Sequence, residues 1–334
     1  MSKLLPILEN FIMKVQPEWR AIHEVADKYR PYIQKIYIRA FKQLSESVDI
    51  DKLAEVGFSL MEEAIDWSVF RTACEKNYDA IGRIVADSGT QASFYLSRKK
   101  FLNRNQPVRK DSTGDEPKGT GIPLETVTIP VVVRTTGFEL SAIGSFNMRN
   151  PKAIEWATKY VGDNIREVEN VTREAVRAII ADALKYGGHP RETAREIRQF
   201  IGLTEKQVKS ILNYQRKLDE SGRSVSRVNE MVDSQVRRLI RRRAETIART
   251  ETIDAANQGQ MLHWEDMAGQ GYLDKRFIKK KWSTTPDDRL CKVCNALNGE
   301  IVDIDKEFSW GGMRPTRHPK CRCSISLVEV DEIE

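Results

Sequence analysis

The sequence SQVRRLIRRRAETIARTETIDAANQGQ, residues 234–260, predicts a long amphipathic helix. At 100° per residue, one face of this helix is apolar and consists of Val236, Leu239, Ile240, Ala244 and Ile247. The opposite face holds four arginines, Arg238, Arg241, Arg242 and Arg249. Arg243 falls on the apolar side, where a buried guanidinium needs a partner. We expect a mainly α fold around this helix.

Helical signals continue on the N-terminal side, so that residues 151–262 indicate a string of helices joined by short turns. VTREAVRAIIADALKYGG, residues 171–188, ends on two glycines, which are the expected helix stop. TEKQVKSILNYQRKLDESG, residues 204–222, begins with the threonine and glutamine of a capping box. We therefore predict that 151–262 forms one helical region.

The first third of the chain also has helical spacing. RPYIQKIYIRAFKQLSESV, residues 30–48, has apolar side chains at helical intervals, and residues 1–102 are predicted to form an N-terminal helical region. Residues 103–150 differ, because Pro, Gly, Lys and Asp dominate up to residue 123 and β-branched residues follow. This composition predicts a linker and a short β segment.

The C-terminal residues 263–334 change character again. RFIKKKWSTTPD, residues 276–287, is typical of a strand, and CRCSISLVEV, residues 321–330, alternates as a half-buried strand does. An Asn-Gly pair at 298–299 indicates a tight turn. The predicted fold class is therefore mainly α with a small C-terminal α/β (α+β) module that contains cysteines.

Composition limits the class of protein. The chain has 334 residues, a formal net charge of +6 and a pI of about 8.9, which favours contact with polyanions but equally fits a soluble basic surface. We expect no membrane span, because no stretch of about 18 apolar residues occurs. MSKLLPILENFIMKV, residues 1–15, is interrupted by Pro6, Glu9 and Asn10. We interpret it as an amphipathic helix of a cytoplasmic product, whose thiols stay reduced.

Four of the five cysteines lie in the C-terminal module. Cys291 and Cys294 have the spacing of a metal-binding knuckle, and His318, Cys321 and Cys323 follow. These five residues are candidates for the four positions of a tetrahedral zinc ion, held by three cysteines and the histidine or by four cysteines. A site closed by four protein ligands would be structural, because it leaves no position for water.

Other interpretations of the cysteines remain open. A disulfide such as Cys291–Cys323 is one alternative, and buried reduced thiols that support a small core are another. Cys321 and His318 could in principle form a nucleophile and a base, but four cysteines beside one histidine fit metal or cross-link chemistry better. Cys74 lies far from the others in the sequence and is predicted to be an ordinary core thiol.

Three elements of the sequence resemble a known family when they are taken in order. They are the Arg-Thr-Glu helix, the element W-x-T-x-x-D-x-R-x-C-x2-C-x2-L-x-G at 282–299, and the final H-P-x-C-R-C at 318–323. Together they are similar to the head-morphogenesis domain of tailed phages, in the Mu F-like minor head proteins, over about residues 150–328. The resemblance is specific because the ordered combination is much rarer than any single piece.

The resemblance implies a minor capsid protein of a virion that is associated with the portal vertex and acts in head assembly, and for some members in handling DNA during ejection. It implies a portal protein, a scaffold or major capsid protein and packaged DNA as partners, and it does not by itself imply an enzyme. The positions that follow the family pattern around the cysteines, which we interpret as structural, are Trp282, Asp287, Arg289 and Gly299.

Packaged DNA would be a binding partner for the basic side chains, since Lys and Arg contact phosphates without reading the base sequence. The candidates are Arg238, Arg241 and Arg242 on the long helix and Lys279, Lys280 and Lys281 in RFIKKKW. The alternative for the helix is a solvated face with i, i+4 ion pairs between Arg241 and Glu245 and between Glu245 and Arg249.

An enzyme is the alternative from another class. Arg249, the Ser-Thr-Thr run at 283–285 and a later acid, Glu300 or Glu307, resemble in order the Arg, Ser-Thr and Glu elements of ADP-ribosyltransferases. Such spacing arises readily by chance. The opposing interpretation is that Arg249 and Glu251 cap or brace their helix. Asp287, Asp288 and Arg289 would then form a turn with ion pairs.

Overall fold

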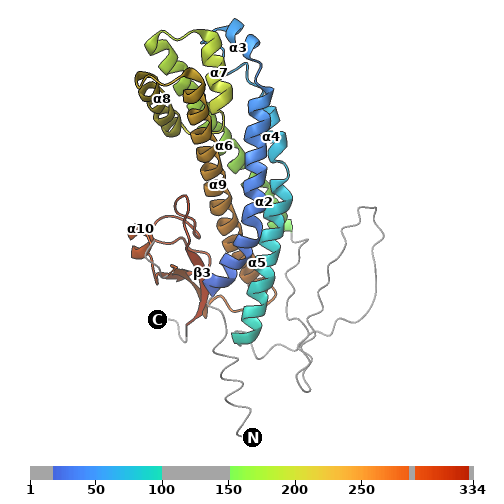
Figure 1. Ribbon diagram of the computed structural model, residues 1–334. Helices are drawn as coiled ribbons and strands as arrows, with labels where there is room; N and C mark the ends of the chain where they lie inside the picture. The colour runs from blue at the N-terminus through green and yellow to red at the C-terminus, as the bar shows by residue number, and fades with distance from the viewer. Residues whose placement is uncertain (1–17, 100–150, 286–289, 331–334) are drawn as a thin grey trace, which may run out of the picture.

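The computed structural model describes residues 18–99, 151–285 and 290–330, and its chain is mainly helical (Figure 1). The long helices are α2 (Glu18–Ser47), α5 (Asn77–Lys99), α6 (Pro151–Tyr186), α8 (Glu205–Glu220) and α9 (Val225–Gly269), and the short ones are α3 (Ile50–Val56), α4 (Ser68–Cys74), α7 (Pro190–Phe200) and α10 (Lys292–Ala296). The strands are β1 (Ile278–Ser283), β2 (Ile301–Asp303) and β3 (Ser324–Glu329). The predicted fold class is confirmed. The predicted β segment of 103–150 and the predicted helix at 1–15 lie outside the described residues.

Helix α9 is the central element of the fold. Ser224 caps its N-terminus by accepting a hydrogen bond from the backbone N–H of Arg227, and the helix continues through residue 262 to Gly269. Figure 1 shows α2 and α5 lying along α9, with α7 and α8 at its N-terminal end and the small sheet near its C-terminal end. Helix α6 runs along the bundle, and the ring of Trp156 near its start lies under the Arg314 guanidinium of the C-terminal module. One helix therefore connects the helical region directly to the cysteine module.

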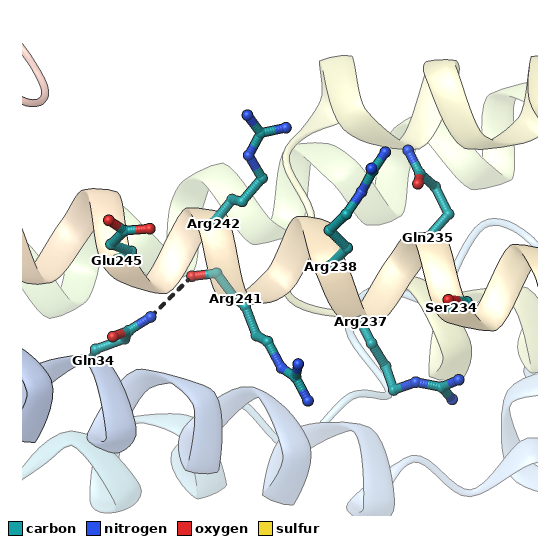
Figure 2. A pocket seen from close by; sticks show the side chains of 8 residues that line it. All are labelled: Gln34, Ser234, Gln235, Arg237, Arg238, Arg241, Arg242 and Glu245. Carbon is teal, nitrogen blue, oxygen red and sulfur yellow. Dashed lines mark hydrogen bonds between the residues drawn. The ribbon is translucent and has the colours of Figure 1, made fainter.

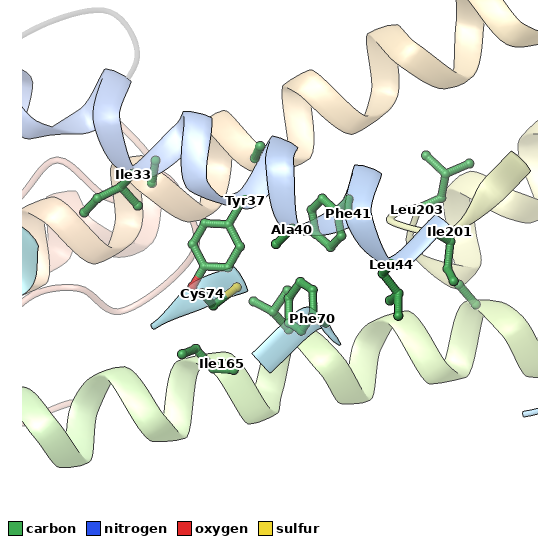
Figure 3. Packing of buried hydrophobic residues seen from close by; sticks show 14 of the residues in the cluster. Ile33, Tyr37, Ala40, Phe41, Leu44, Phe70, Cys74, Ile165, Ile201 and Leu203 are labelled. Carbon is green, nitrogen blue, oxygen red and sulfur yellow. The ribbon is translucent and has the colours of Figure 1, made fainter. Parts of the chain in front are cut away.

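The bundle core forms around the apolar stripe of α9. Val236 and Ala244 are buried, and the core continues into aromatic rings of α2 and α4, where Phe41 stacks on Phe70 with centroids 5.5 Å apart (Figure 3). Cys74 is buried in this core, as predicted. The predicted capping box at the start of α8 is also present, because Thr204 and Gln207 exchange side-chain hydrogen bonds with each other's backbone N–H.

The buried Arg243 has the partners that its position on the apolar stripe requires. Its guanidinium donates hydrogen bonds to Thr172 Oγ1 at 3.1 Å, to the Leu203 carbonyl at 2.8 Å and to the Val168 carbonyl at 3.1 Å. The same group lies over the ring of Phe41, 5.0 Å from its centroid. Arg243 thus joins α6, the turn before α8 and α9 in one polar contact inside the bundle.

The C-terminal sheet has the strand order β2-β1-β3, and both pairings are antiparallel. Alternation along β1 buries Ile278, Lys280 and Trp282. Trp282 packs edge-on against Phe308 at 5.2 Å, within a second core to which α9 contributes its own side chains, Met261, Trp264 and Met267. The module is therefore built against the end of α9, and Trp282 has the structural role that its sequence position predicts.

Between Glu251 and Trp264, helix α9 is buried on all sides although its sequence is rich in polar residues. Helix α5 approaches so closely that Ser88 Oγ donates to the Ala256 carbonyl at 2.6 Å. At Gly259, a Cβ atom would lie 2.4 Å from the Val85 carbonyl oxygen. The small side chains of this stretch are thus required by the packing of α5 on α9.

The buried carboxyl of Glu251 accepts a hydrogen bond from Tyr37 Oη at 2.5 Å. Burial raises the pKa of Glu251 to about 8. Because the folded protein holds this proton and the unfolded chain loses it above about pH 4.3, the contribution of Glu251 to stability is full below that pH. It declines as the pH rises toward 8, by on the order of 5 kcal/mol.

Replacing Glu251 with glutamine should remove most of this decline, since glutamine does not titrate. We expect the free energy of unfolding of Glu251→Gln to depend less on pH between 5 and 8 than that of the wild type, as measured by urea denaturation with EDTA present throughout. Glu245→Gln, an exposed change on the same helix, should keep the wild-type dependence. Parallel curves for the wild type and Glu251→Gln would contradict the assignment.

No helix in the ranges 18–99, 151–285 and 290–330 combines the length and the apolar character needed to cross a membrane.

Candidate metal centre

The four C-terminal cysteines and His318 converge on one point of the module. Cys291 caps the N-terminus of α10, and its sulfur accepts a hydrogen bond from the backbone N–H of Cys294 at 3.2 Å. The loop between β2 and β3 supplies His318 and Cys321, and Cys323 immediately precedes β3. The chain therefore brings the knuckle and the later residues together across 27 positions, the separation of Cys294 from Cys321.

Three donor atoms at a time are close enough to share one ion, and Cys294 links the two sets. His318 Nε2 lies 3.2 Å from Cys291 Sγ and 3.1 Å from Cys294 Sγ, and Cys294 Sγ lies 3.8 Å from Cys321 Sγ. Two groups of three donors meet the distance requirement for a metal, namely Cys291, Cys294 and His318, and Cys294, Cys321 and Cys323. Cys294 belongs to both groups, so it is the centre of the constellation.

These separations fit a tetrahedral zinc site. With bonds of about 2.3 Å to sulfur and 2.0–2.1 Å to nitrogen, a tetrahedral ion requires S–S distances of about 3.8 Å and S–N distances of about 3.5 Å. The S–S distance of 3.8 Å agrees, and the S–N distances are slightly shorter. All five cysteines are free thiols, and the S–S separation far exceeds the length of a disulfide bond, about 2.05 Å.

His318 is oriented for coordination through one ring nitrogen. Its Nδ1 lies 2.9 Å from the carbonyl oxygen of Pro319, and because a carbonyl can only accept, Nδ1 carries the proton. The lone pair of Nε2 then faces the sulfur atoms of Cys291 and Cys294. A hydrogen bond of this kind fixes the tautomer and the ring orientation of metal-binding histidines.

The thiols of this cluster do not ionise together in the absence of a cation. Burial raises the pKa of Cys294 to about 12. A hydrogen bond from Cys323 lowers the pKa of Cys321 to about 5, and the same bond raises the pKa of Cys323. A divalent cation would offset the repulsion between neighbouring thiolates, so the donor set suits a metal that binds sulfur.

The space at the cluster is small. A pocket of about 30 Å³ opens there and is lined by Thr285, Leu290, Cys291, Cys294, His318, Lys320, Arg322 and Cys323. This is room for an ion or a water molecule, whereas pockets for small organic ligands measure about 300–1,000 Å³.

The residues of the ADP-ribosyltransferase alternative have structural partners. Thr285 Oγ1 donates to the Arg322 carbonyl at 2.8 Å, and the Thr284 N–H donates to Asn298 Oδ1 at 3.2 Å. The Glu300 carboxylate accepts hydrogen bonds from the backbone N–H of Ser309 at 2.6 Å and from its hydroxyl at 2.9 Å. These contacts brace the module, and the pocket beside Thr285 has no room for a dinucleotide.

The arginine candidates for DNA contact line one groove on α9, with a volume of about 430 Å³. We call it the arginine groove, and its lining residues are Gln34, Ser234, Gln235, Arg237, Arg238, Arg241, Arg242 and Glu245. Figure 2 shows Arg237 and Arg241 extending toward α2, and Arg238 and Arg242 extending to the other side of α9. Arg237 was not among the candidates predicted from the sequence, although it directly precedes Arg238 and this adjacency was a signal for it.

The four arginines of the groove are exposed, and none forms an ion pair with another described residue. The i, i+4 ion pair between Arg241 and Glu245, which was the alternative for this face, is therefore not formed. Unpaired guanidinium groups close together repel one another and favour an anionic partner. The electrostatics of the groove thus suit phosphate.

The lysines of β1 do not form one surface, and this corrects the prediction for Lys280. Lys280 is buried, and its ammonium donates to the Met313 carbonyl at 2.8 Å, because alternation along β1 directs it into the module core. Burial lowers the pKa of Lys280 to about 8. Lys279 and Lys281 lie on the open face of the sheet, and Lys279 pairs with Asp303 at 3.3 Å.

The remaining family-like positions divide between described and undescribed residues. Gly299 has φ of 88°, as the predicted tight turn requires, and its N–H donates to the Trp282 carbonyl at 2.9 Å. Asp287 and Arg289 lie outside the described residues.

Comparison with known proteins agrees with the motif resemblance. The family model described as phage Mu protein F like protein matches residues 174–326, from the middle of α6 into β3. The match thus includes the whole Cys/His cluster and every lining residue of the arginine groove except Gln34. Searches of curated proteins and of solved structures gave no match. Residues 174–326 are thus similar to the phage Mu protein F-like family, and this match supports a phage head morphogenesis protein.

Proposed function

We propose that this chain is a minor head protein of a tailed bacteriophage that associates with the portal protein in the virion. In this role it contacts scaffold or major capsid subunits during assembly in the host cytoplasm, and packaged DNA afterwards, during packaging or ejection. The observation that supports this most directly is the family match, which spans the helices α7, α8 and α9 and the cysteine module together. We propose a structural role with no enzymatic activity.

We further propose that the module holds one structural zinc ion. Cys291, Cys294, His318 and Cys321 are the first choice of ligands, and Cys323 is the substitute. The ion would supply a cross-link between α10 and the loop before β3, with no position left for water. The support is the convergence of five donors around Cys294 and the spacing of their atoms.

The arginine groove is proposed to contact DNA phosphates without sequence preference, with Lys279 and Lys281 as further contacts. Replacing Arg238, Arg241 and Arg242 together with alanine should weaken binding to duplex DNA of any sequence. It should also reduce the slope of log affinity against log salt concentration by about 1 for each lost phosphate contact. Fluorescence anisotropy over a salt series measures both quantities.

Arg227→Ala is the matched control for the groove variant. Arg227 is exposed on the same helix, but it is already paired with Glu230 at 2.6 Å and lies outside the groove. It should leave the salt slope unchanged. Equal slopes for the wild type and the triple variant would contradict DNA contact by the groove.

The proposed role in the head is tested by assembling the chain with the portal protein of its own phage and with the capsid subunits, and imaging the complex at side-chain resolution. Density for this chain at the portal vertex is the expected result. Its absence from assembled heads would contradict the proposal. An NAD hydrolysis assay on the purified chain tests the enzyme alternative, and turnover above that of heat-inactivated protein would favour it.

A further inference from the structure

Three polar side chains of α9 face the loop that supplies His318, Cys321 and Cys323. Thr250, Asp254 and Asn257 are spaced i, i+4 and i+7, so they form one row along the helix. We call it the T-D-N row. All three bind backbone or side-chain groups of the segment from Arg314 to Ile325, which we call the ligand loop.

Asn257 binds the ligand loop as a neighbouring strand would. Its side-chain oxygen accepts from the Ile325 N–H at 3.0 Å, and its side-chain nitrogen donates to the Cys323 carbonyl at 3.3 Å and to the Ile253 carbonyl of its own helix at 2.9 Å. Ser324 lies between these two groups and pairs with Ser283 on the other edge. Asn257 is fully buried. Its side chain thus provides hydrogen-bond partners for the Cys323 carbonyl and the Ile325 N–H, on the edge of the chain that does not pair with β1.

The other two members hold the part of the loop around His318 and Cys321. Thr250 Oγ1 accepts from the Lys320 N–H at 3.1 Å, and Lys320 has φ of 64°, a conformation that non-glycine residues adopt at a cost. Asp254 accepts from the Arg314 guanidinium at 2.9 Å and from the Thr316 N–H at 3.3 Å. Helix α9 therefore holds the loop on both sides of His318 and next to both later cysteines.

We infer that the T-D-N row is the positioning element of the metal centre, an inference that rests on the proposed zinc site. The row holds the backbone of the ligand loop against a rigid helix, so the donor atoms of His318, Cys321 and Cys323 are placed before an ion binds. Groups that orient metal ligands typically change metal affinity about 10–100-fold when they are removed. The sequence TETIDAAN at 250–257 thereby acquires a role that its position on a helix alone does not reveal.

Cobalt(II) titration of the full-length protein tests the inference, because cobalt bound to thiolates has a charge-transfer absorption and ligand-field bands that report the ligand set. We expect Asn257→Ala to weaken cobalt affinity about 10–100-fold and to change the ligand-field bands. Thr250→Val, a milder change that keeps the side-chain shape, should weaken affinity in the same direction by less. It provides the test if Asn257→Ala does not fold, as judged by circular dichroism.

Ser88→Ala is the matched control. It also removes a buried hydrogen bond to α9, the bond from Ser88 Oγ to the Ala256 carbonyl, but on the side of the helix that faces α5. Its cobalt affinity and spectrum should equal those of the wild type. If the folded T-D-N variants bind cobalt as tightly as Ser88→Ala and with the same spectrum, the positioning role is overturned while the metal site stands. If the wild type gives no thiolate-cobalt absorption, both proposals are overturned.

Discussion

Replacing Cys294 with serine is expected to weaken zinc binding by at least about 100-fold, the largest effect of any single change in the module. Cys294 is the one residue that belongs to both groups of three donors, and its sulfur lies within 3.8 Å of both His318 Nε2 and Cys321 Sγ. Serine keeps the shape but offers a hydroxyl, which is a poor ligand for zinc compared with a thiolate.

The measurement is competition with a chromogenic chelator, followed by zinc analysis of the dialysed protein. Cys74→Ala is the control, because Cys74 is buried in the helical bundle and takes no part in either donor group. It should lower stability and leave one zinc ion bound. If Cys294→Ser retains one tightly bound zinc ion, the proposed site is wrong.

The second large effect is expected from Gly259→Ala, which should lower the free energy of unfolding by about 3 kcal/mol. The added Cβ would lie 2.4 Å from the carbonyl oxygen of Val85 and 3.0 Å from the Ser88 Cβ, so α5 and α9 would have to separate. The separation would also stretch the hydrogen bond from Ser88 to Ala256. Urea denaturation of the full chain measures the loss.

Gly82→Ala provides the comparison within α5. A Cβ at Gly82 meets no atom within 4 Å, so this change should stabilise the protein by up to about 1 kcal/mol through helix propensity. If Gly259→Ala lowers the free energy of unfolding and Gly82→Ala raises it, the close approach of α5 and α9 decides the effect of each substitution. Helix propensity alone would stabilise both variants. A Gly259→Ala protein as stable as Gly82→Ala would refute the close approach.

The elements predicted from local patterns are those whose causes lie within a few residues. The capping box at Thr204 and Gln207, the apolar stripe of α9 and the alternation of β1 all depend on spacings of two to four positions, which the sequence shows directly. The knuckle of Cys291 and Cys294 is equally local. These signals were sufficient for the mainly α fold and for the identity of the candidate metal ligands.

The sequence by itself therefore determined the type of each element and the set of candidate side chains, but not what surrounds them. In the sequence, nothing distinguishes Lys280 from its neighbours Lys279 and Lys281, but packing of the sheet buries Lys280. The polar residues from Glu251 to His263 likewise gave no sign that this stretch would be buried. The contact of Asn257 with Cys323 spans 66 positions. Only tertiary structure decides such matters, because burial and long-range pairing depend on which elements pack together, and no local spacing specifies that choice.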